Sequence, residues 1–176
     1  MDGRTMLLCI VGVPCIGAFF LPILGQISAR LRNYAALGLA LFPLICTISI
    51  ASGVFAGRNF DSCIYFNNSF DFILYADGLA VFMGIVSAMI SSIIIFYSFG
   101  YISHYENQDE YYLMVLLFLG GMMGIVFSGS LIYLYLFWEI TAITSWRLIG
   151  FFREKQSNYC LFDGEVVLAA EVFCLG

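Results

Sequence analysis

The chain of 176 residues is too apolar for a typical soluble domain: 62% of its residues are hydrophobic, 11% are charged, and its mean hydropathy is +0.96. Soluble domains are about half apolar and about a quarter charged. Seven Lys and Arg residues, a single His and a net charge of -5 exclude the basic surface that nucleic-acid binding needs. Six scattered cysteines form no Cys-x-x-Cys pair, so the sequence predicts neither a zinc site nor an iron–sulfur cluster. It has no haem motif and no glycine-rich dinucleotide loop either, so no bound cofactor and no catalytic site are predicted.

The apolar residues fall into segments that are long enough to cross a bilayer, which takes roughly 20 helical residues. Five spans are predicted, at residues 5–24, 34–55, 78–101, 112–128 and 131–152. The first span resembles a signal peptide, but it contains two prolines and lacks a small-x-small cleavage site, so we interpret it as a transmembrane helix. The fourth is short and is expected to borrow residues from its flanks. A sixth apolar run, 159–176, contains three acidic residues and is interpreted as a partial span at most.

The basic residues of the short loops predict how the chain is oriented, because Lys and Arg bias a loop to the cytoplasm. Arg30 and Arg32 follow the first span, and Arg153 and Lys155 follow the fifth. Both loops are therefore expected on the cytoplasmic side, which agrees with the four spans between them and places the N-terminus outside. The acidic segment SHYENQDEYY, between the third and fourth spans, is interpreted as a solvated cytoplasmic turn.

The longest loop contains CIYFNNSFDFILY, two β-prone runs on either side of residues 67–69, which predicts a short hairpin on the outer surface. Asp77 follows this loop and is expected to cap the third helix. Gly120 and Gly124, one helical turn apart, would let a neighbouring helix approach the fourth span closely.

No repeat or linker divides the chain. We therefore expect an all-α fold: a single membrane domain over residues 1–176, built as a polytopic transmembrane helix bundle with one short β-hairpin.

The fifth predicted span carries a carboxylate deep inside the membrane. Glu139 lies eight residues beyond Leu131, about 12 Å into a hydrocarbon core about 30 Å thick. A charged residue at that depth costs about 2.5–3.5 kcal/mol, so Glu139 is expected to face other helices, line a hydrated cavity or be protonated. A carboxyl that gains and loses a proton there could serve as a proton relay. The alternative is a neutral glutamate that hydrogen-bonds a neighbouring helix and only stabilises the bundle.

Other polar residues of the same span are candidates for a pathway. Arg147 lies about 12 Å along the helix from Glu139 and about 80° around it, which excludes a direct ion pair within one helix. Its long side chain can reach the membrane interface, and we favour that interpretation over a place in the pathway. Thr141, Thr144 and Ser145 lie near Glu139 and could hydrogen-bond water or backbone, or could be ordinary helix-packing groups.

Two stretches of the chain resemble a known family. YADGLAVFMGIVSAMISSIIIFYSFGYIS and YYLMVLLFLGGMMGIVFSGSLIYLYLFWEITAITSWRLIGFF are similar to the N-terminal part of the antiporter-like proton-channel subunits. That family includes subunit 5 of complex I (NADH–quinone oxidoreductase), the large A-type component of Mrp cation/proton antiporters, and their counterparts in membrane-bound hydrogenases. The Asp-Gly-Leu, Tyr-Ser-x-Gly-Tyr and Phe-Trp-Glu-x-Thr elements stand in the family's order across residues 77–152. The form Phe-Trp-Glu-Ile-Thr is more similar to the Mrp and hydrogenase branch.

This resemblance implies a multi-pass subunit of the cell's inner (plasma) membrane, with other membrane subunits and the lipid bilayer as partners. Glu139 matches the family's span-five glutamate, which belongs to a proton path and works with a lysine in span seven. The chain ends before such a span, so the resemblance leads us to expect a truncated chain, with a diverged or frame-shifted tail after Cys160, where the match is poor. Gly129-Ser130 stands where the family usually has Asp-Asn, and Arg147 where it usually has an apolar residue.

Two functions are open at this point. The first is a membrane subunit of an ion-translocating complex, in which Glu139 is a proton relay for the transport of protons or of sodium exchanged for them. The second is a truncated, non-transporting fragment or accessory subunit that only packs against partner subunits. The resemblance assigns any redox chemistry to partner subunits, so the chain would at most be a subunit of a proton-translocating oxidoreductase or antiporter.

Overall fold

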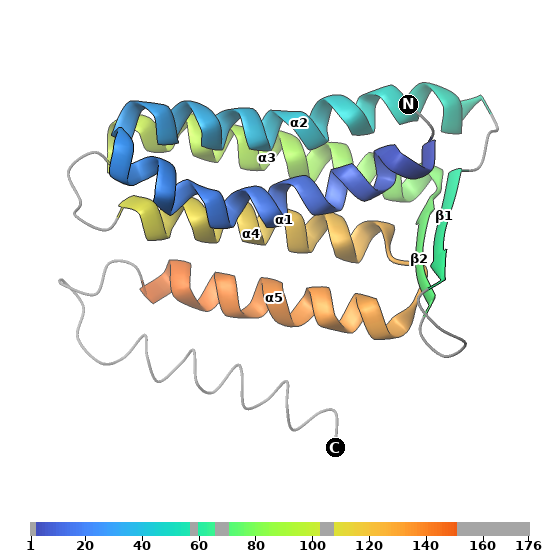
Figure 1. Ribbon diagram of the computed structural model, residues 1–176. Coiled ribbons are helices and arrows are strands. Elements are labelled where there is room, and N and C mark those ends of the chain that lie inside the picture. Colours follow the sequence, from blue (N-terminus) through green and yellow to red (C-terminus); the bar gives the residue numbers. More distant parts are fainter. Residues whose placement is uncertain (1–2, 57–59, 66–70, 103–107, 151–176) are drawn as a thin grey trace, which may run out of the picture.

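The computed structural model describes residues 3–56, 60–65, 71–102 and 108–150. Long helices lie side by side and alternate in direction, with a two-stranded sheet across one end (Figure 1). The helices are α1 (Gly3–Ile27), α2 (Ala29–Phe55), α3 (Gly78–Tyr101), α4 (Gln108–Phe127) and α5 (Leu131–Ile149), and the strands are β1 (Phe60–Tyr65) and β2 (Asp71–Ala76). This confirms the predicted helical bundle and its single hairpin.

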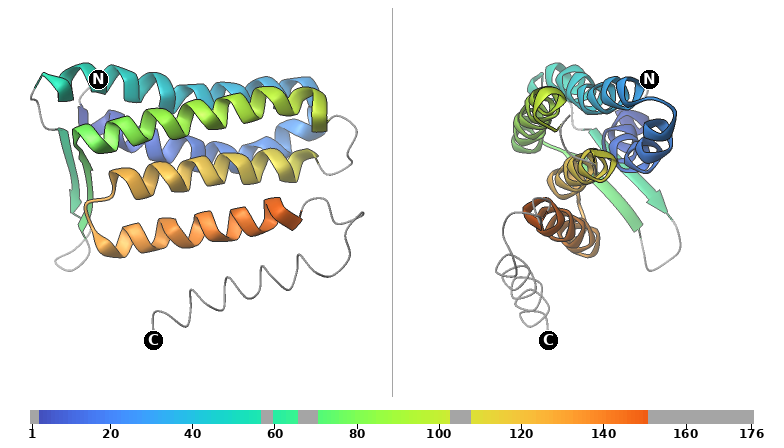
Figure 2. Two further views of the ribbon diagram at one scale, coloured as in Figure 1. Left: turned by 180° about the vertical axis from the view of Figure 1, so that it is seen from behind. Right: turned by 90° about the vertical axis from the view of Figure 1, so that its left-hand side faces the viewer.

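Four of the described helices, α1 to α4, are long and apolar enough to cross a membrane. As predicted, α4 takes residues from its flank, because it begins at Gln108. The fifth predicted segment is a helix of 19 residues, but Glu139 and Arg147 lower its hydropathy and it does not meet the same criterion. It nevertheless runs alongside α4 (Figures 1 and 2). The predicted partial span at 159–176 lies outside the described residues.

The alternating directions divide the bundle into two ends. The strands lie at the end where α3 and α5 begin, which we call the hairpin end (Figure 1). The junction of α1 with α2, the start of α4 and the end of α5 lie at the opposite end, which we call the polar end. The basic residues predict that the junction after α1 and the residues after α5 lie on one side of the membrane, and the ends of these helices have that arrangement.

Helix α4 is the centre of the described bundle, because it lies between α5 and the other three helices (Figure 2, right). Leu116, Leu119, Met123 and Phe127 of α4 are fully buried. They belong to one apolar core with side chains of α1, α2 and α3. The core therefore forms on one side of α4, while its other side is left for α5.

Glycines of α4 allow the close approach that the sequence predicts. A Cβ at Gly120 would meet the Cys15 backbone nitrogen of α1 at 3.1 Å. A Cβ at Gly121 would lie 2.7 Å from the Thr141 methyl group of α5, and one at Gly124 would overlap the ring of Phe137. The stripe of small residues thus brings α1 and α5 against two sides of α4.

Gly124→Ala should lower the melting temperature of the detergent-solubilised protein, because the added methyl group overlaps the Phe137 ring. Overpacking of this kind costs about 1–3 kcal/mol. Gly38→Ala is the matched control, since a Cβ at Gly38 of α2 meets nothing within 4 Å and alanine is the better helix former. Equal melting temperatures for the two variants would contradict the close contact between α4 and α5.

The hairpin pairs β1 with β2 in antiparallel register, from Phe60 opposite Ala76 to Tyr65 opposite Asp71. It also joins the α4–α5 connection, where the Gly129 backbone N–H donates to the Ile73 carbonyl at 2.8 Å. The predicted hairpin is confirmed, although its turn at residues 67–69 lies outside the described residues.

The predicted cap of α3 is confirmed too: the Asp77 carboxylate accepts a hydrogen bond from the Ala80 backbone N–H at 2.7 Å.

Candidate functional site

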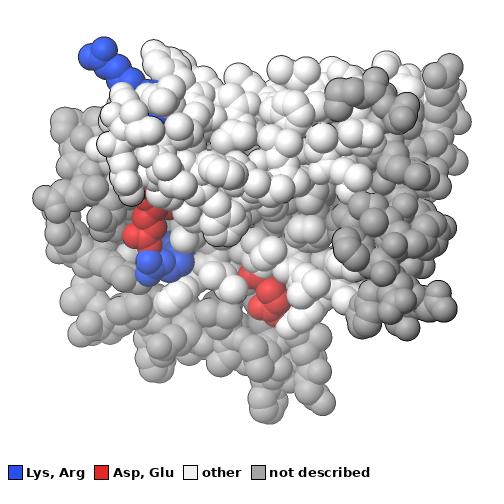
Figure 3. All heavy atoms as spheres, in the orientation of Figure 1, with Lys and Arg blue, Asp and Glu red and all other residues white. Residues whose placement is uncertain are grey.

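The charged side chains are unevenly distributed over the molecule. Figure 3 shows a face that is mostly uncharged, with acidic and basic groups together toward the polar end and one separate acidic group nearer the middle. Ion pairs among the described residues join Arg32 to Asp109 and Arg147 to Glu110. The polar end and the middle of α5 are therefore the two places where the described structure combines charge with apolar surroundings.

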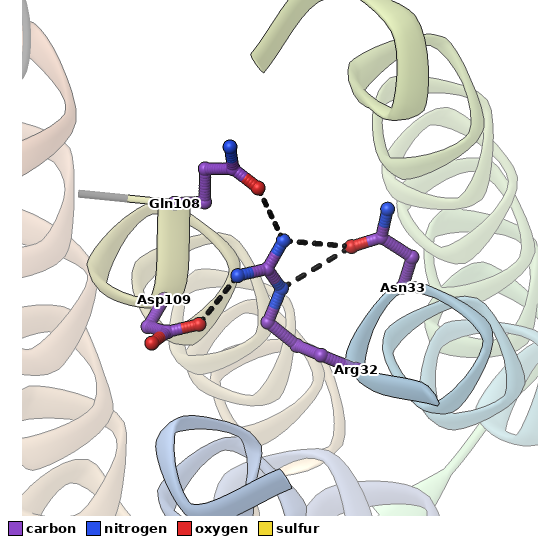
Figure 4. Close-up of polar contacts among 4 residues, drawn as sticks. All are labelled: Arg32, Asn33, Gln108 and Asp109. Carbon is purple, nitrogen blue, oxygen red and sulfur yellow. Dashed lines mark hydrogen bonds and ion pairs between the residues drawn. The ribbon is translucent and has the colours of Figure 1, made fainter. Parts of the chain in front are cut away.

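Arg32, in the first turn of α2, is the centre of a polar cluster (Figure 4). The residue is only 4% exposed. Its guanidinium donates to the carboxylate of Asp109 at 2.5 Å and to the side-chain oxygen of Gln108 at 2.5 Å. Two further bonds, of 3.2 and 3.0 Å, reach the side-chain oxygen of Asn33. The guanidinium also lies 5.0 Å from the centre of the Tyr112 ring, so this buried charge is paired on several sides.

A second ion pair lies on the other side of α4. Arg147, in the last turn of α5, donates to the carboxylate of Glu110, and the two side chains are 31% and 36% exposed. Asp109 and Glu110 are consecutive residues in the first turn of α4, where the helix dipole favours negative charge. The interpretation of this acidic segment as a turn is wrong for these two residues, because they lie in α4. Each carboxylate is partly exposed and binds an arginine from another helix.

Glu139 lies near the midpoint of α5 and is half-buried. It makes no hydrogen bond or ion pair with any residue that the structure describes. Buried Thr141, by contrast, contacts Gly121 of α4. Glu139 and Thr141 are two residues apart in the helix, which places them about 160° apart around its axis. Glu139 therefore lies on the side of α5 that faces away from α4.

The other candidate pathway residues are not joined to Glu139. The Thr141 hydroxyl donates to the Trp138 carbonyl at 2.7 Å, and the Thr144 hydroxyl lies 2.8 Å from the Ile140 carbonyl. Ser145 is half-buried and forms no hydrogen bond within the described part of the chain. Arg147 is engaged by Glu110, a pairing that sequence reasoning missed. A role for these four residues in a pathway stays a prediction.

Comparison with known proteins identifies related sequences. No family model matches the chain. The A1 subunit of the Na(+)/H(+) antiporter of Staphylococcus aureus is 33% identical over 166 residues, which cover 92% of this chain and 20% of that protein. The A1 subunits of the S. aureus strains JH9 and Newman match over the same length at the same identity. The chain thus spans about a fifth of the length of these curated relatives.

Solved structures share the fold of this chain. The membrane-bound sulfane sulfur reductase, an archaeal respiratory membrane complex, contains a chain that superposes with a TM-score of 0.81 at 22% identity, over 93% of this chain and 33% of that one. The Mrp complex from Dietzia sp. DQ12-45-1b gives a TM-score of 0.76 at 20% identity, over 93% of this chain and 18% of that one. At these identities the likeness establishes the fold alone.

Proposed function

We propose that this chain is an antiporter-like membrane subunit, since it is 33% identical over 92% of its length to the A1 subunit of a Na(+)/H(+) antiporter, and that Glu139 is its proton-relay group. The chain would supply this carboxyl to a multi-subunit membrane complex that transports protons, or sodium in exchange for protons. The names of the relatives support the class of transport, and the complex-forming neighbours support other membrane subunits as partners.

One observation carries the proposal. Of the acidic side chains that the structure describes, Asp77, Asp109 and Glu110 each accept a hydrogen bond from a partner, and Glu139 does not. An ionised carboxylate without a partner is costly inside a membrane, so Glu139 must be protonated, hydrated or paired with a group from beyond the described residues. A carboxyl that passes between the protonated and ionised states at that depth can hand protons from one side to the other.

The basic residues support an orientation for the bundle. We place the polar end at the cytoplasmic face of the cell's inner (plasma) membrane, because Arg30 and Arg32 lie there in a short connection. The N-terminus and the hairpin are then outside. In this arrangement Glu139 lies between the two faces, as a relay requires.

Labelling with a membrane-soluble carbodiimide tests the proposal, because such reagents modify protonated carboxyls that are shielded from water. In native membranes, mass spectrometry should find the adduct on Glu139, with a yield that falls as the pH is raised. Ion-paired Asp109 should stay unmodified and serves as the internal control. Transport by the complex should fall in proportion to the labelled fraction.

Two outcomes would contradict the relay. If Glu139 stays unlabelled at every pH at which transport runs, its carboxyl does not take up protons from the membrane interior. If Glu139 is labelled and transport continues at its full rate, the alternative holds, in which the chain packs against partner subunits without carrying protons.

A further inference from the structure

Helix α5 is attached to the described bundle almost entirely through α4. At its start, the Gly129 N–H bonds to the Ile73 carbonyl of the hairpin. Along its middle, it packs on Gly121 and Gly124. At its end, Arg147 binds Glu110. These three described attachments therefore help to set the position of the α5 side chains, Glu139 included.

The described contacts between the middle of α5 and α4 are close and apolar. The hydroxyls of Thr141 and Thr144 hydrogen-bond to backbone carbonyls of α5 itself. On the α4 side, the Thr141 methyl group lies against Gly121, which has no side chain to form a hydrogen bond. Packing on small residues brings two helices close together, and a polar contact between helices adds a specific pairing of side chains. A polar contact at the end of α5 would therefore fix the rotation of this helix about its axis and its position along that axis.

The ion pair at the polar end is placed for this task. Arg147 and Glu139 belong to the same helix, and a shift of one residue along an α-helix moves a side chain by about 1.5 Å and turns it by about 100°. Glu110 is held in the first turn of α4, beside Asp109, whose carboxylate is fixed by the buried Arg32. The pair thus connects the end of α5 to the start of α4, where Arg32 is buried.

We propose that Arg147 and Glu110 are positioning residues, which hold α5 in the rotation that presents Glu139 on the side away from α4. This inference rests on the proposed function for its effect on transport, while its structural part stands by itself. Neither residue takes up or releases a transported proton. Both act through the placement of Glu139.

A charge swap tests the inference. Arg147→Gln and Glu110→Gln should each lower the maximal transport rate on the order of tenfold, because small displacements of a reacting group are costly. The apparent affinity for the ion should change little. The double variant Glu110→Arg, Arg147→Glu should restore most of the rate, since it rebuilds the pair with the charges exchanged. Arg30→Gln, at an exposed site of the same end, is the control and should keep the full rate.

A distance measurement separates this inference from the proposed function. Spin labels at Ile93 of α3 and Ile143 of α5, both exposed, report the position of α5 when the native cysteines are replaced. The distance distribution should shift or broaden in each single variant and return in the charge swap. An unchanged distribution in both single variants would overturn the positioning role. If the distances respond as expected but Glu139→Gln transports normally, the positioning stands and the relay fails.

Discussion

Arg32→Leu should destabilise the folded bundle by about 2–3 kcal/mol. The substitution removes hydrogen bonds to Asp109, Gln108 and Asn33, and hydrogen bonds to charged groups contribute about 1.5–3 kcal/mol. It also removes the contact of the guanidinium with the Tyr112 ring. Breaking a fully buried ion pair costs about 3–5 kcal/mol, but the Asp109 side chain is 41% exposed and water can solvate it, so the cost falls below that range.

Thermal unfolding in detergent checks this prediction, with Arg30→Leu as the matched control. Arg30 lies two residues away and is exposed, so its replacement should stay within about 0.5 kcal/mol of the wild type. Asp109→Asn provides a second comparison, because asparagine keeps an acceptor for Arg32 without the charge. A melting temperature for Arg32→Leu equal to that of Arg30→Leu would show that the cluster does not stabilise the bundle.

Much of the fold could be predicted from the sequence because a bilayer restricts what a chain can do. Backbone groups inside hydrocarbon must pair within the segment, so long apolar runs become helices whose approximate bounds follow from hydropathy. The Asp77 cap and the spacing of Gly120 and Gly124 are local signals, and the structure confirms both. The hairpin was predictable because two β-prone runs flank a turn-forming triplet.

The pairing of charges between helices could not be predicted in the same way. Arg32 and Asp109 are 77 residues apart, and Arg147 and Glu110 are 37 apart. Which side chains meet depends on how α4 is rotated between its neighbours, and hydropathy carries little information about that rotation. A signal was nevertheless present: two consecutive acidic residues begin a span on the same side of the membrane as arginines from two other spans.

Glu139→Gln should lower the rate of proton transport by about 100-fold or more, which is the scale of a lost proton-transfer group. Glutamine has nearly the size of glutamate and can still donate and accept hydrogen bonds, but its amide is neither protonated nor deprotonated during transport. Helix α5 should stay in place, because its described contacts with α4 do not include Glu139. Glu139→Asp keeps the carboxyl on a shorter side chain and should retain part of the rate.

The most direct test is the pH gradient formed across inverted membrane vesicles that contain the native complex, followed with a pH-sensitive dye and normalised to the amount of assembled complex. The wild type should change the internal pH, either by acidifying the vesicles if the complex pumps protons or by dissipating a preformed pH gradient when sodium is added if it exchanges sodium for protons. Glu139→Asp should do so more slowly, and Glu139→Gln should do neither. A wild-type rate per complex in Glu139→Gln would contradict the assignment of Glu139 as the proton relay.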